Sequence, residues 1–495
     1  MDRHVIIVGG GLAGLSAGCY ALRNGYRATI VEHNSQLGGV CTAWKRGDYT
    51  IDGCIHWLTG GPFLRFYEEL GILPNVSLRV LDEWATYRDA SDGFQVTFKR
   101  DLDAFVTDLI RTSKEDVLEL EHLRRAAAKF VHVAPPMDAP EVTSLRDDLE
   151  NFWSMRSAIP TLLHYRKPVA LWAKEHLVSP RLRRLFGRMF PETAPALFLL
   201  MVLGYLEKGF LSRPIGGTAA FRDALSRSYW ELGGEALLSA TVEEIVIRDG
   251  RARGVRLGDG SMLDGDAVIS TSSAPETVLQ LLGGRYDATI TRDRLEHWKL
   301  FTPIVLASFG VASPLKDLPA LLIVDRLEPF YVGQQPTESL YIRTCNEDAG
   351  LAPPGHSVIQ AMVPTDYDWW AKDRADYDAA KRDVGSTVLA QLEKCFPGIR
   401  DAVRMIDVAT PLTYWNMARS WRGAYEGWMP TTSSFFGHVG KTLDGLGSFY
   451  MAGQWVEPGG GIPMAVKSGR QAVQLLCRED ERPFIAAAGH AVVGW

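Results

Sequence analysis

The chain has 495 residues, of which 46% are hydrophobic and 23% charged, so it has the composition of a globular protein and the length of two domains. The formal net charge of −6 excludes an extended basic surface and, with it, nucleic acid as a partner. The apolar run Val5–Val8 is too short for a secretory signal, and the six cysteines form no CxxC pair and no His/Cys cluster with zinc spacing. We therefore expect a cytoplasmic protein with free thiols and no metal.

The first complete unit is a strand, a helix and a second strand. Val5–Val8 predicts a buried strand, Leu12–Asn24 has helical spacing, and Arg27–Val31 predicts a second strand that ends at Glu32. The glycines that follow the first strand have the spacing GxGxxG, which is typical of dinucleotide binding. This order of elements predicts a Rossmann-type fold at the start of the chain.

Each residue of this motif has a physical reason. Gly9 permits the turn off the strand, Gly11 lets the backbone approach a pyrophosphate, and Gly14 allows the helix to pack closely on the sheet. The pyrophosphate binds at the helix N-terminus, formed here by Leu12 and Ala13. Glu32 accepts hydrogen bonds from the adenosine ribose and would repel the 2′-phosphate of NADP, so FAD and NAD stay open.

The next segment, SQLGGVCTAWKRGDYTIDGCIHWLTGG, carries Gly38-Gly39 and then Asp52-Gly53. Here the sequence resembles the large family of FAD-dependent amine oxidases, phytoene desaturases, carotenoid isomerases and retinol saturases. In that family a Gly-Gly pair follows the ribose-binding acid, and an Asp-Gly element ends the following strand. The resemblance implies that the cofactor is FAD and that this stretch passes under its ribityl and phosphate portion.

Two later blocks extend the resemblance. Pro214-Ile215-Gly216-Gly217, the helix Thr218–Leu232 and a hairpin turning at Asp249-Gly250 resemble the family's middle FAD segment, in which the backbone of Val242 would meet the adenine. Residues 448–476 form an apolar strand, a glycine-rich turn and a helix whose first amides would face the flavin N1–C2=O edge. Gln454 stands where the family often has an acid, so that ribityl contact is weaker or arranged differently.

Together these blocks predict the cofactor-binding positions, some from the dinucleotide motif and the others from the resemblance. They are Gly9, Gly11, Leu12, Ala13, Gly14, Glu32, Gly38, Gly39, Val242, Gly453, Gln454, Gly461, Ile462 and Met464.

Within the family, the middle and last blocks most resemble the phytoene desaturase and carotenoid isomerase branch. The resemblance implies an oxidoreductase acting on C–C or C=C bonds of an apolar unsaturated lipid, by desaturation, saturation or isomerisation. Gly440-Lys441-Thr442 is no P-loop, because Phe435 replaces the first glycine of that motif. Two alternatives stay open: an amine-oxidase-like enzyme with a smaller polar substrate, and a non-enzymatic relative of the Rab GDP-dissociation inhibitors.

Candidate substrate and catalytic residues are fewer. His56 follows Asp52-Gly53 and is interpreted either as a proton donor or flavin-tuning group, or as a structural histidine. Aromatic side chains are frequent in the expected substrate region, where they suit an unsaturated ligand or a core: Trp369, Trp370, Trp415, Trp421, Tyr425 and Trp428. Of these, Trp415 and Trp428 are the predicted substrate contacts.

The predicted architecture is α/β (α+β overall). A discontinuous Rossmann-type FAD domain, residues 1–75, 212–285 and 430–480, carries an inserted substrate domain, residues 76–211 and 286–429, with an antiparallel sheet and a helical cap. Ala194–Leu206 is too short to span a bilayer and is either a buried helix or a surface helix that dips into a membrane or lines an oily channel. The expected partner is an apolar small molecule, and the sequence indicates no oligomeric state.

Overall fold

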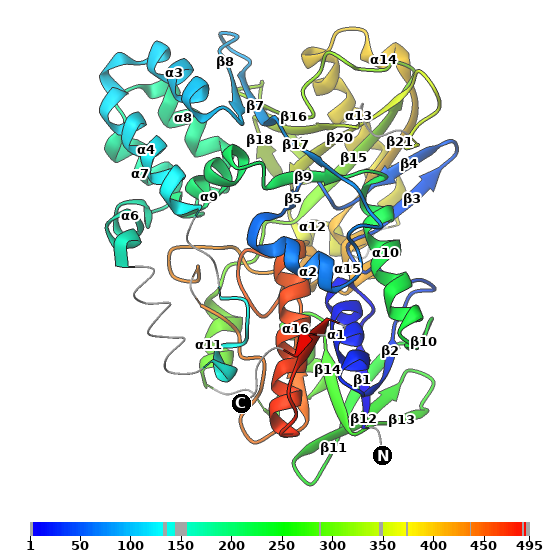
Figure 1. Ribbon diagram of the computed structural model, residues 1–495. Coiled ribbons are helices and arrows are strands. Elements are labelled where there is room, and N and C mark those ends of the chain that lie inside the picture. Colours follow the sequence, from blue (N-terminus) through cyan, green and yellow to red (C-terminus); the bar gives the residue numbers. More distant parts are fainter. Residues whose placement is uncertain are drawn as a thin grey trace.

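The computed structural model describes residues 3–131, 136–143, 156–286, 289–345, 350–372, 375–435, 437–487 and 490–491. Two large sheets dominate it (Figure 1). A parallel sheet lies in the lower half of the view beside α1 and α16, and a larger sheet lies above it. A group of helices stands beside the larger sheet and forms a cap.

The parallel sheet has the strand order β10-β2-β1-β14-β22. Its strands are β1 (His4–Val8), β2 (Arg27–Val31), β10 (Glu235–Leu237), β14 (Ala267–Ser270) and β22 (Phe449–Met451). The central strands are apolar and buried, as strands with both faces covered must be. One face packs on α1 (Leu12–Arg23), α10 (Gly217–Glu231) and α16 (Gly461–Glu479), and the other on the sheet of β11 (Val242–Arg248), β12 (Arg251–Leu257) and β13 (Met262–Asp264).

Glycines set the spacing of the helices on this sheet. A Cβ atom at Gly469 of α16 would lie 2.6 Å from the carbonyl oxygen of Ala13, and one at Gly18 of α1 would lie 2.5 Å from the ring of Tyr229 on α10. The predicted hairpin turn is confirmed as well: Asp249 and Gly250 have φ angles of 51° and 69°, as a two-residue hairpin turn requires.

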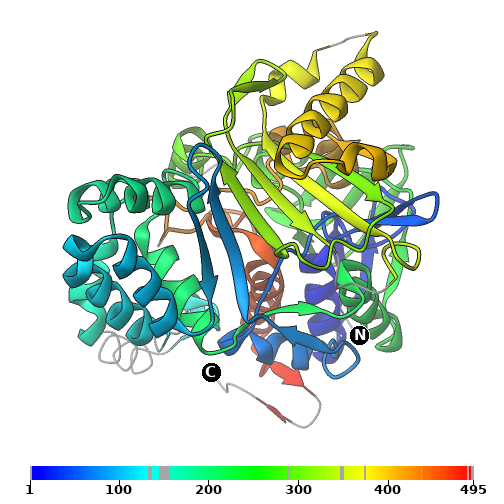
Figure 2. The ribbon, with the colours of Figure 1, turned by 90° about the horizontal axis from the view of Figure 1, so that it is seen from above.

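The larger sheet has the order β21-β15-β20-β19-β16-β7-β8. Its strands are β7 (Glu83–Asp89), β8 (Gln95–Lys99), β15 (Ile304–Val311), β16 (Leu321–Asp325), β19 (Leu340–Thr344), β20 (Ser357–Pro364) and β21 (Val403–Ala409). The prediction of an antiparallel sheet needs one correction, because β7 and β16 pair in parallel. β7 and β16 come from two separate parts of the chain inserted between strands of the parallel sheet. No hairpin connects them, so their relative direction is not set by a turn. Figure 2 shows α13 (Tyr377–Cys395) crossing one face of this sheet.

The cap consists of α3 (Leu102–Thr112), α4 (Val117–Phe130), α6 (Ile159–Tyr165), α7 (Val169–His176), α8 (Pro180–Met189) and α9 (Ala196–Glu207). Nearly all of α9 is buried, which confirms the buried-helix interpretation of the apolar segment and makes the surface-helix alternative wrong. Among the described residues, no helix combines the length and apolarity that crossing a membrane requires.

Shorter elements connect these layers. They are β3 (Ala43–Arg46), β4 (Tyr49–Asp52), β5 (Leu58–Thr59), α2 (Leu64–Glu69), β6 (Leu78–Val80), β9 (Leu211–Pro214), α11 (Thr289–His297), β17 (Phe330–Val332), β18 (Gln335–Thr337), α12 (Tyr367–Ala371), α14 (Ile399–Ala402), α15 (Pro411–Ala418), β23 (Ile485–Ala487) and β24 (His490–Ala491). The small sheet β5-β9-β6 lies where the chain passes between the FAD segments and the cap. The exact domain limits stay a prediction.

Candidate active site

Four strands of the parallel sheet end together. In the pairing register Val8 lies beside both Val31 and Ser270, and Ser270 lies beside Met451. The residues that follow these strands therefore meet at one edge of the sheet, its carboxyl edge. In open α/β sheets this edge is where nucleotide ligands bind.

The glycine loop after β1 forms the first wall of this edge. Gly9 has a φ of +93°, and a Cβ at Gly14 would lie 2.0 Å from the Gly9 carbonyl oxygen, so both positions require glycine. At Gly11 an added Cβ would be 3.8 Å from the nearest atom, so the protein itself leaves room there. The first turn of α1, which includes Leu12 and Ala13, has no side-chain cap and no acidic residue. Its amides fit a diphosphate.

Glu32 lies at the end of β2 with its carboxylate fixed. Its Oε2 accepts the Gly10 amide at 2.7 Å, and its Oε1 accepts the Asn34 amide at 2.9 Å. Burial raises the pKa of Glu32, but the hydrogen bonds from His33, Asn34 and Gly10 outweigh burial and hold that pKa below its usual value. The carboxylate is therefore ionised at neutral pH and can accept ribose hydroxyls. The Ala240 amide donates to the Glu32 carbonyl at 3.0 Å, which sets Val242 near the same strand end.

The Gly38-Gly39 pair lies directly against the glycine loop. The Gly38 amide donates to the Gly10 carbonyl at 2.8 Å, and Gly11 forms an isolated bridge with Gly38. Both members of the pair have positive φ, 138° and 58°. A Cβ at Gly39 would reach within 3.0 Å of the Gly11 Cα, so only glycine permits this approach of two backbones.

Asp52 is placed differently from the rest of this segment. Its carboxylate is buried and accepts the amide of Thr218 at 2.8 Å and the hydroxyl of Thr218 at 2.6 Å, so it holds the start of α10. It also pairs with Arg343 of the larger sheet. Asp52 is therefore a residue that joins the two halves of the fold, and its side chain is turned into the protein.

The turn between β22 and α16 forms the opposite wall of the edge. Gly453 has a φ of +107° and donates its amide to the Ser468 hydroxyl at 2.7 Å. The Gln454 side chain donates to the Tyr425 carbonyl at 2.8 Å, so the polar group that replaces the family's acid is tied to the neighbouring loop.

The helix that follows is α16, and it begins at Gly461 with no side-chain cap and no acid in its first turn. The first turn also contains Ile462, which is buried, and Met464, which is half-buried. The free amides of this turn suit the flavin edge that gains negative charge on reduction.

A buried ion triad supports this turn. Glu457 pairs with Lys441 at 3.2 Å and with Lys467 at 2.5 Å, and both ammonium groups are nearly inaccessible. Burial raises the pKa of Glu457, but the two ammonium groups outweigh it and lower that pKa to about 2. Lys441, which belongs to the incomplete P-loop pattern, therefore helps to stabilise the glycine-rich turn.

A cluster of weakly acidic side chains stands next to the turn, and most of its members carry no local signal in the sequence. The ring of Tyr425 lies 6.0 Å from that of Tyr414 and 5.9 Å from that of Phe301. Glu426 lies against Gly460, where a Cβ would be 2.8 Å from the Glu426 Cβ. Burial raises the pKa of Glu426 to about 7. Glu426 follows Tyr425, one of the aromatic residues of the expected substrate region, but nothing in the local sequence marks a carboxyl that becomes buried.

The tyrosines of this cluster are also neutral. Burial raises the pKa values of Tyr341, Tyr414 and Tyr425 far above their usual range. Tyr414 lies near Cys54, and Tyr425 lies near Glu426, Tyr414 and Tyr341, so these groups form one cluster. The cluster brings together the loop after β4, β19 and the segment around Tyr425.

His56 belongs to the same region, with its backbone carbonyl accepting from Arg213 at 2.9 Å. Burial and the positive charges of Arg343 and Arg213 lower the pKa of His56 to about 3, so its imidazole is neutral at physiological pH. This low pKa disfavours a proton donor at His56. The assignment of His56 as a flavin-tuning group or as a structural histidine stays a prediction.

The predicted aromatic contacts separate into two groups. Trp428 is 1% exposed and donates to the Trp455 carbonyl at 2.9 Å, and Trp370 is also fully buried, so both are core residues. Trp428 therefore offers no surface to a ligand, and its assignment as a substrate contact is wrong. Trp415 is half-buried beside Trp421, and the carbonyl of the next residue accepts from His33. This places Trp415 on the Glu32 side of the edge.

The residues that meet at this edge fit FAD. A dinucleotide requires hydrogen-bond donors for its phosphates and an acceptor for its ribose. The edge offers two uncapped helix N-termini, a fixed carboxylate at the end of β2 and a glycine loop with free space at Gly11. The Gly38-Gly39 pair and the Gly453–Gly461 turn line the rest of the edge.

Comparisons with known proteins agree with this assignment. The phytoene desaturase (neurosporene-forming) of Rhodobacter capsulatus is 25% identical over 96% of this chain and 94% of its own. Prolycopene isomerase 1 of an Oncidium hybrid cultivar is 24% identical over 100% of this chain and 88% of its own. Among solved structures, an oxidoreductase from Methanosarcina mazei superposes with a TM-score of 0.62 at 17% identity, covering 95% of this chain and 100% of that one, which shows the same fold.

The relatives thus lie in the phytoene desaturase and carotenoid isomerase branch, as the sequence motifs indicate, and the cofactor is FAD. Residues 12–477 match the family described as flavin containing amine oxidoreductase. The chain belongs to this family.

Proposed function

We propose that the protein is an FAD-dependent enzyme that acts on C–C or C=C bonds of an apolar polyene, by desaturation, saturation or isomerisation. The carotenoid desaturases and isomerases that match the chain over nearly its full length support this substrate class. We also propose that the predicted cofactor contacts, from Gly9 to Met464, bind the FAD.

The observation that carries the proposal is that His56, Tyr414, Tyr425 and Glu426, next to the flavin-facing turn, include no carboxylate that is fully ionised at neutral pH. At neutral pH Tyr414 and Tyr425 are neutral, His56 is neutral, and Glu426 is partly protonated. A cationic amine would need a fixed carboxylate or an acidic pocket to compensate for its desolvation. A hydrocarbon chain needs neither, so these walls favour the apolar substrate over an amine.

The protein's own residues have three tasks in such a reaction. Bound FAD supplies the capacity to take up or return a hydride. The first-turn amides of α16 would stabilise negative charge on the bound flavin, and the Lys441–Glu457–Lys467 triad holds the loop that positions them. Glu426, with a pKa of about 7, is suited to hold or release the proton that accompanies the redox step.

The test is anaerobic incubation of the FAD-loaded protein with carotenoids, retinoids, fatty acids and amines, monitored by the flavin spectrum and product mass. Bleaching by a polyene with loss of two hydrogens indicates desaturation, and gain of two by reduced enzyme indicates saturation. A product of unchanged mass and altered retention indicates isomerisation. Reduction by an amine, with no response to any lipid, would overturn the proposal in favour of the amine-oxidase alternative.

Peripheral membrane contact and a cytoplasmic location are kept in the proposal as well. Apolar side chains at the surface of the cap support such contact, since Leu163, Leu171 and Val178 are 57%, 42% and 58% exposed. Sedimentation with lipid vesicles tests it. We expect replacement of these three side chains by serine to reduce the bound fraction, and unchanged sedimentation would contradict the contact.

A further inference from the structure

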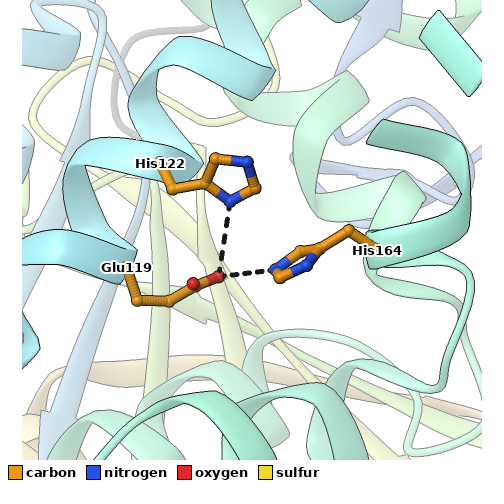
Figure 3. A group of neighbouring side chains, drawn as sticks. All are labelled: Glu119, His122 and His164. Carbon is orange, nitrogen blue, oxygen red and sulfur yellow. Dashed lines mark hydrogen bonds and ion pairs between the residues drawn. The ribbon is translucent and has the colours of Figure 1, made fainter. Parts of the chain in front are cut away.

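Three potential metal ligands meet in the cap, outside the flavin site. Glu119 and His122 lie one turn apart on α4, and His164 projects toward them from α6 (Figure 3). The Glu119 Oε1 lies 3.0 Å from the His164 Nε2 and 3.9 Å from the His122 Nδ1. The three ligand atoms all lie within 4.8 Å of one another.

Neighbouring side chains hold the carboxylate in place. The Glu119 Oε1 also accepts the Trp172 indole N–H at 3.2 Å and the Tyr165 hydroxyl at 3.4 Å. Such outer contacts orient the ligands of metal sites. Trp172 and Tyr165 are fully buried, so the orientation of Glu119 depends on the packing of α4 against α6 and α7.

The ring of His176 from α7 lies 4.4 Å from that of His164 and packs against it. A glutamate one turn before a histidine on a helix is a recurrent ligand pair in helical metal sites.

We propose that Glu119, His122 and His164 bind one divalent transition-metal ion of the zinc type. Ligand bonds of about 2.0–2.2 Å to such an ion place tetrahedral ligand atoms about 3.3 Å apart. The two distances from Glu119 bracket this value, so small side-chain rotations complete the set. A water molecule takes the fourth position, as in sites with two histidines and a glutamate.

A metal ion at this site would stabilise the cap. It lies on the side of the molecule away from α1 and α16 (Figure 1). An ion held by α4 and α6 would add a link between two helices that already meet through Tyr165, whose hydroxyl contacts both Glu119 and His122. Its expected effect is to hold the outer end of the cap together, without a part in the redox step.

The test uses the tag-free, FAD-loaded full chain, first treated with a chelator and then titrated with Zn²⁺. We expect one equivalent to bind by calorimetry and elemental analysis. His122→Ala and His164→Ala are expected to weaken binding at least about tenfold. His297→Ala is the matched control, because His297 also pairs with a carboxylate, that of Asp293 at 3.1 Å, and has no third ligand among the described residues. Equal binding by all three variants, or none by the wild type, would overturn the proposal.

A milder variant and a spectroscopic probe separate binding from folding. Glu119→Gln keeps a side-chain oxygen for Trp172 and Tyr165 but loses the charge, so we expect an unchanged circular dichroism spectrum with binding at least about tenfold weaker. Co²⁺ in place of Zn²⁺ is expected to give the visible bands of a nitrogen and oxygen site with low coordination. A thiolate-to-cobalt band would place the ion on cysteine and overturn the assignment.

Discussion

Asp52 and Arg343 form an ion pair from which solvent is excluded. The Asp52 Oδ1 lies 3.2 Å from the Arg343 Nη1, and the two side chains are 1% and 2% exposed. Asp52 ends β4, beside the start of α10, whereas Arg343 lies in β19 of the larger sheet. This pair therefore fixes the position of the larger sheet relative to the FAD segments.

Removal of the cation from this pair should destabilise the fold strongly. Arg343→Met leaves the Asp52 carboxylate buried without its partner, and we expect the free energy of unfolding to fall by about 3–5 kcal/mol. Lys394→Met is the matched control, because its pair with Glu328 is exposed and such pairs contribute about 0–1 kcal/mol. Urea unfolding of the FAD-loaded proteins measures both. Similar losses in the two variants would contradict the prediction.

A substitution at Gly11 tests the position of the cofactor without disturbing the fold. Because the nearest atom to an added Cβ is 3.8 Å away, we expect Gly11→Ala to fold normally. The methyl group would occupy the space of the pyrophosphate, so flavin absorbance of the purified protein should fall at least about tenfold. Gly187→Ala in the cap, where the Cβ also meets only ordinary contacts, should retain its flavin. A full flavin content in the Gly11→Ala protein would contradict the assignment of the pyrophosphate to this position.

Glu457 should make the protein sensitive to acid. Its folded-state pKa of about 2 lies below the usual 4.5, so the unfolded chain binds the proton more readily. The resulting stabilisation, about 3 kcal/mol, is complete above pH 4.5 and is lost as the pH falls toward 2. In Glu457→Gln this part of the acid dependence should disappear. Urea midpoints of both proteins across this window provide the measurement, and parallel curves would refute the assignment.

Glu426 should titrate with the opposite sign. Its folded-state pKa of about 7 exceeds the usual 4.5, so the folded protein binds the proton more readily. The free energy of unfolding should therefore decrease as the pH rises from 4.5 to 7, by about 3 kcal/mol. The carboxylic-acid carbonyl band in the infrared should vanish with an apparent pKa near 7 and be absent from Glu426→Gln. A band already lost at pH 5 would contradict this.

Local patterns predicted the cofactor half of the fold well, because its glycines are required by the backbone itself. Gly9, Gly14 and Gly38 each stand where a side chain would strain the turn or collide with the neighbouring backbone, and these requirements leave a spacing in the sequence. The buried strand and hairpin patterns were equally local. The predicted strands Val5–Val8 and Arg27–Val31 correspond to β1 and β2 almost residue by residue, and the predicted hairpin turn lies between β11 and β12.

Features that depend on distant contacts could not be predicted in this way. Trp428 and Trp415 look alike in sequence, yet Trp455 and Trp298 enclose the first in the core. The acidity of Glu426 depends on burial by other segments, and His164 reaches Glu119 from a different helix with no fixed spacing. The parallel pairing of β7 with β16 likewise joins two insertions that are far apart in the chain.

The strand order of the parallel sheet also determines when the protein can acquire its cofactor during synthesis. β1 and β2 leave the ribosome first, but β14 and then β22 must arrive before the carboxyl edge is complete, and α16 follows last. Until then the apolar edge of β1 has no partner strand, and such edges promote aggregation in nascent chains. Flavin insertion is thus a late step in biogenesis, and a chain stopped before Met451 would emerge colourless and dependent on chaperones.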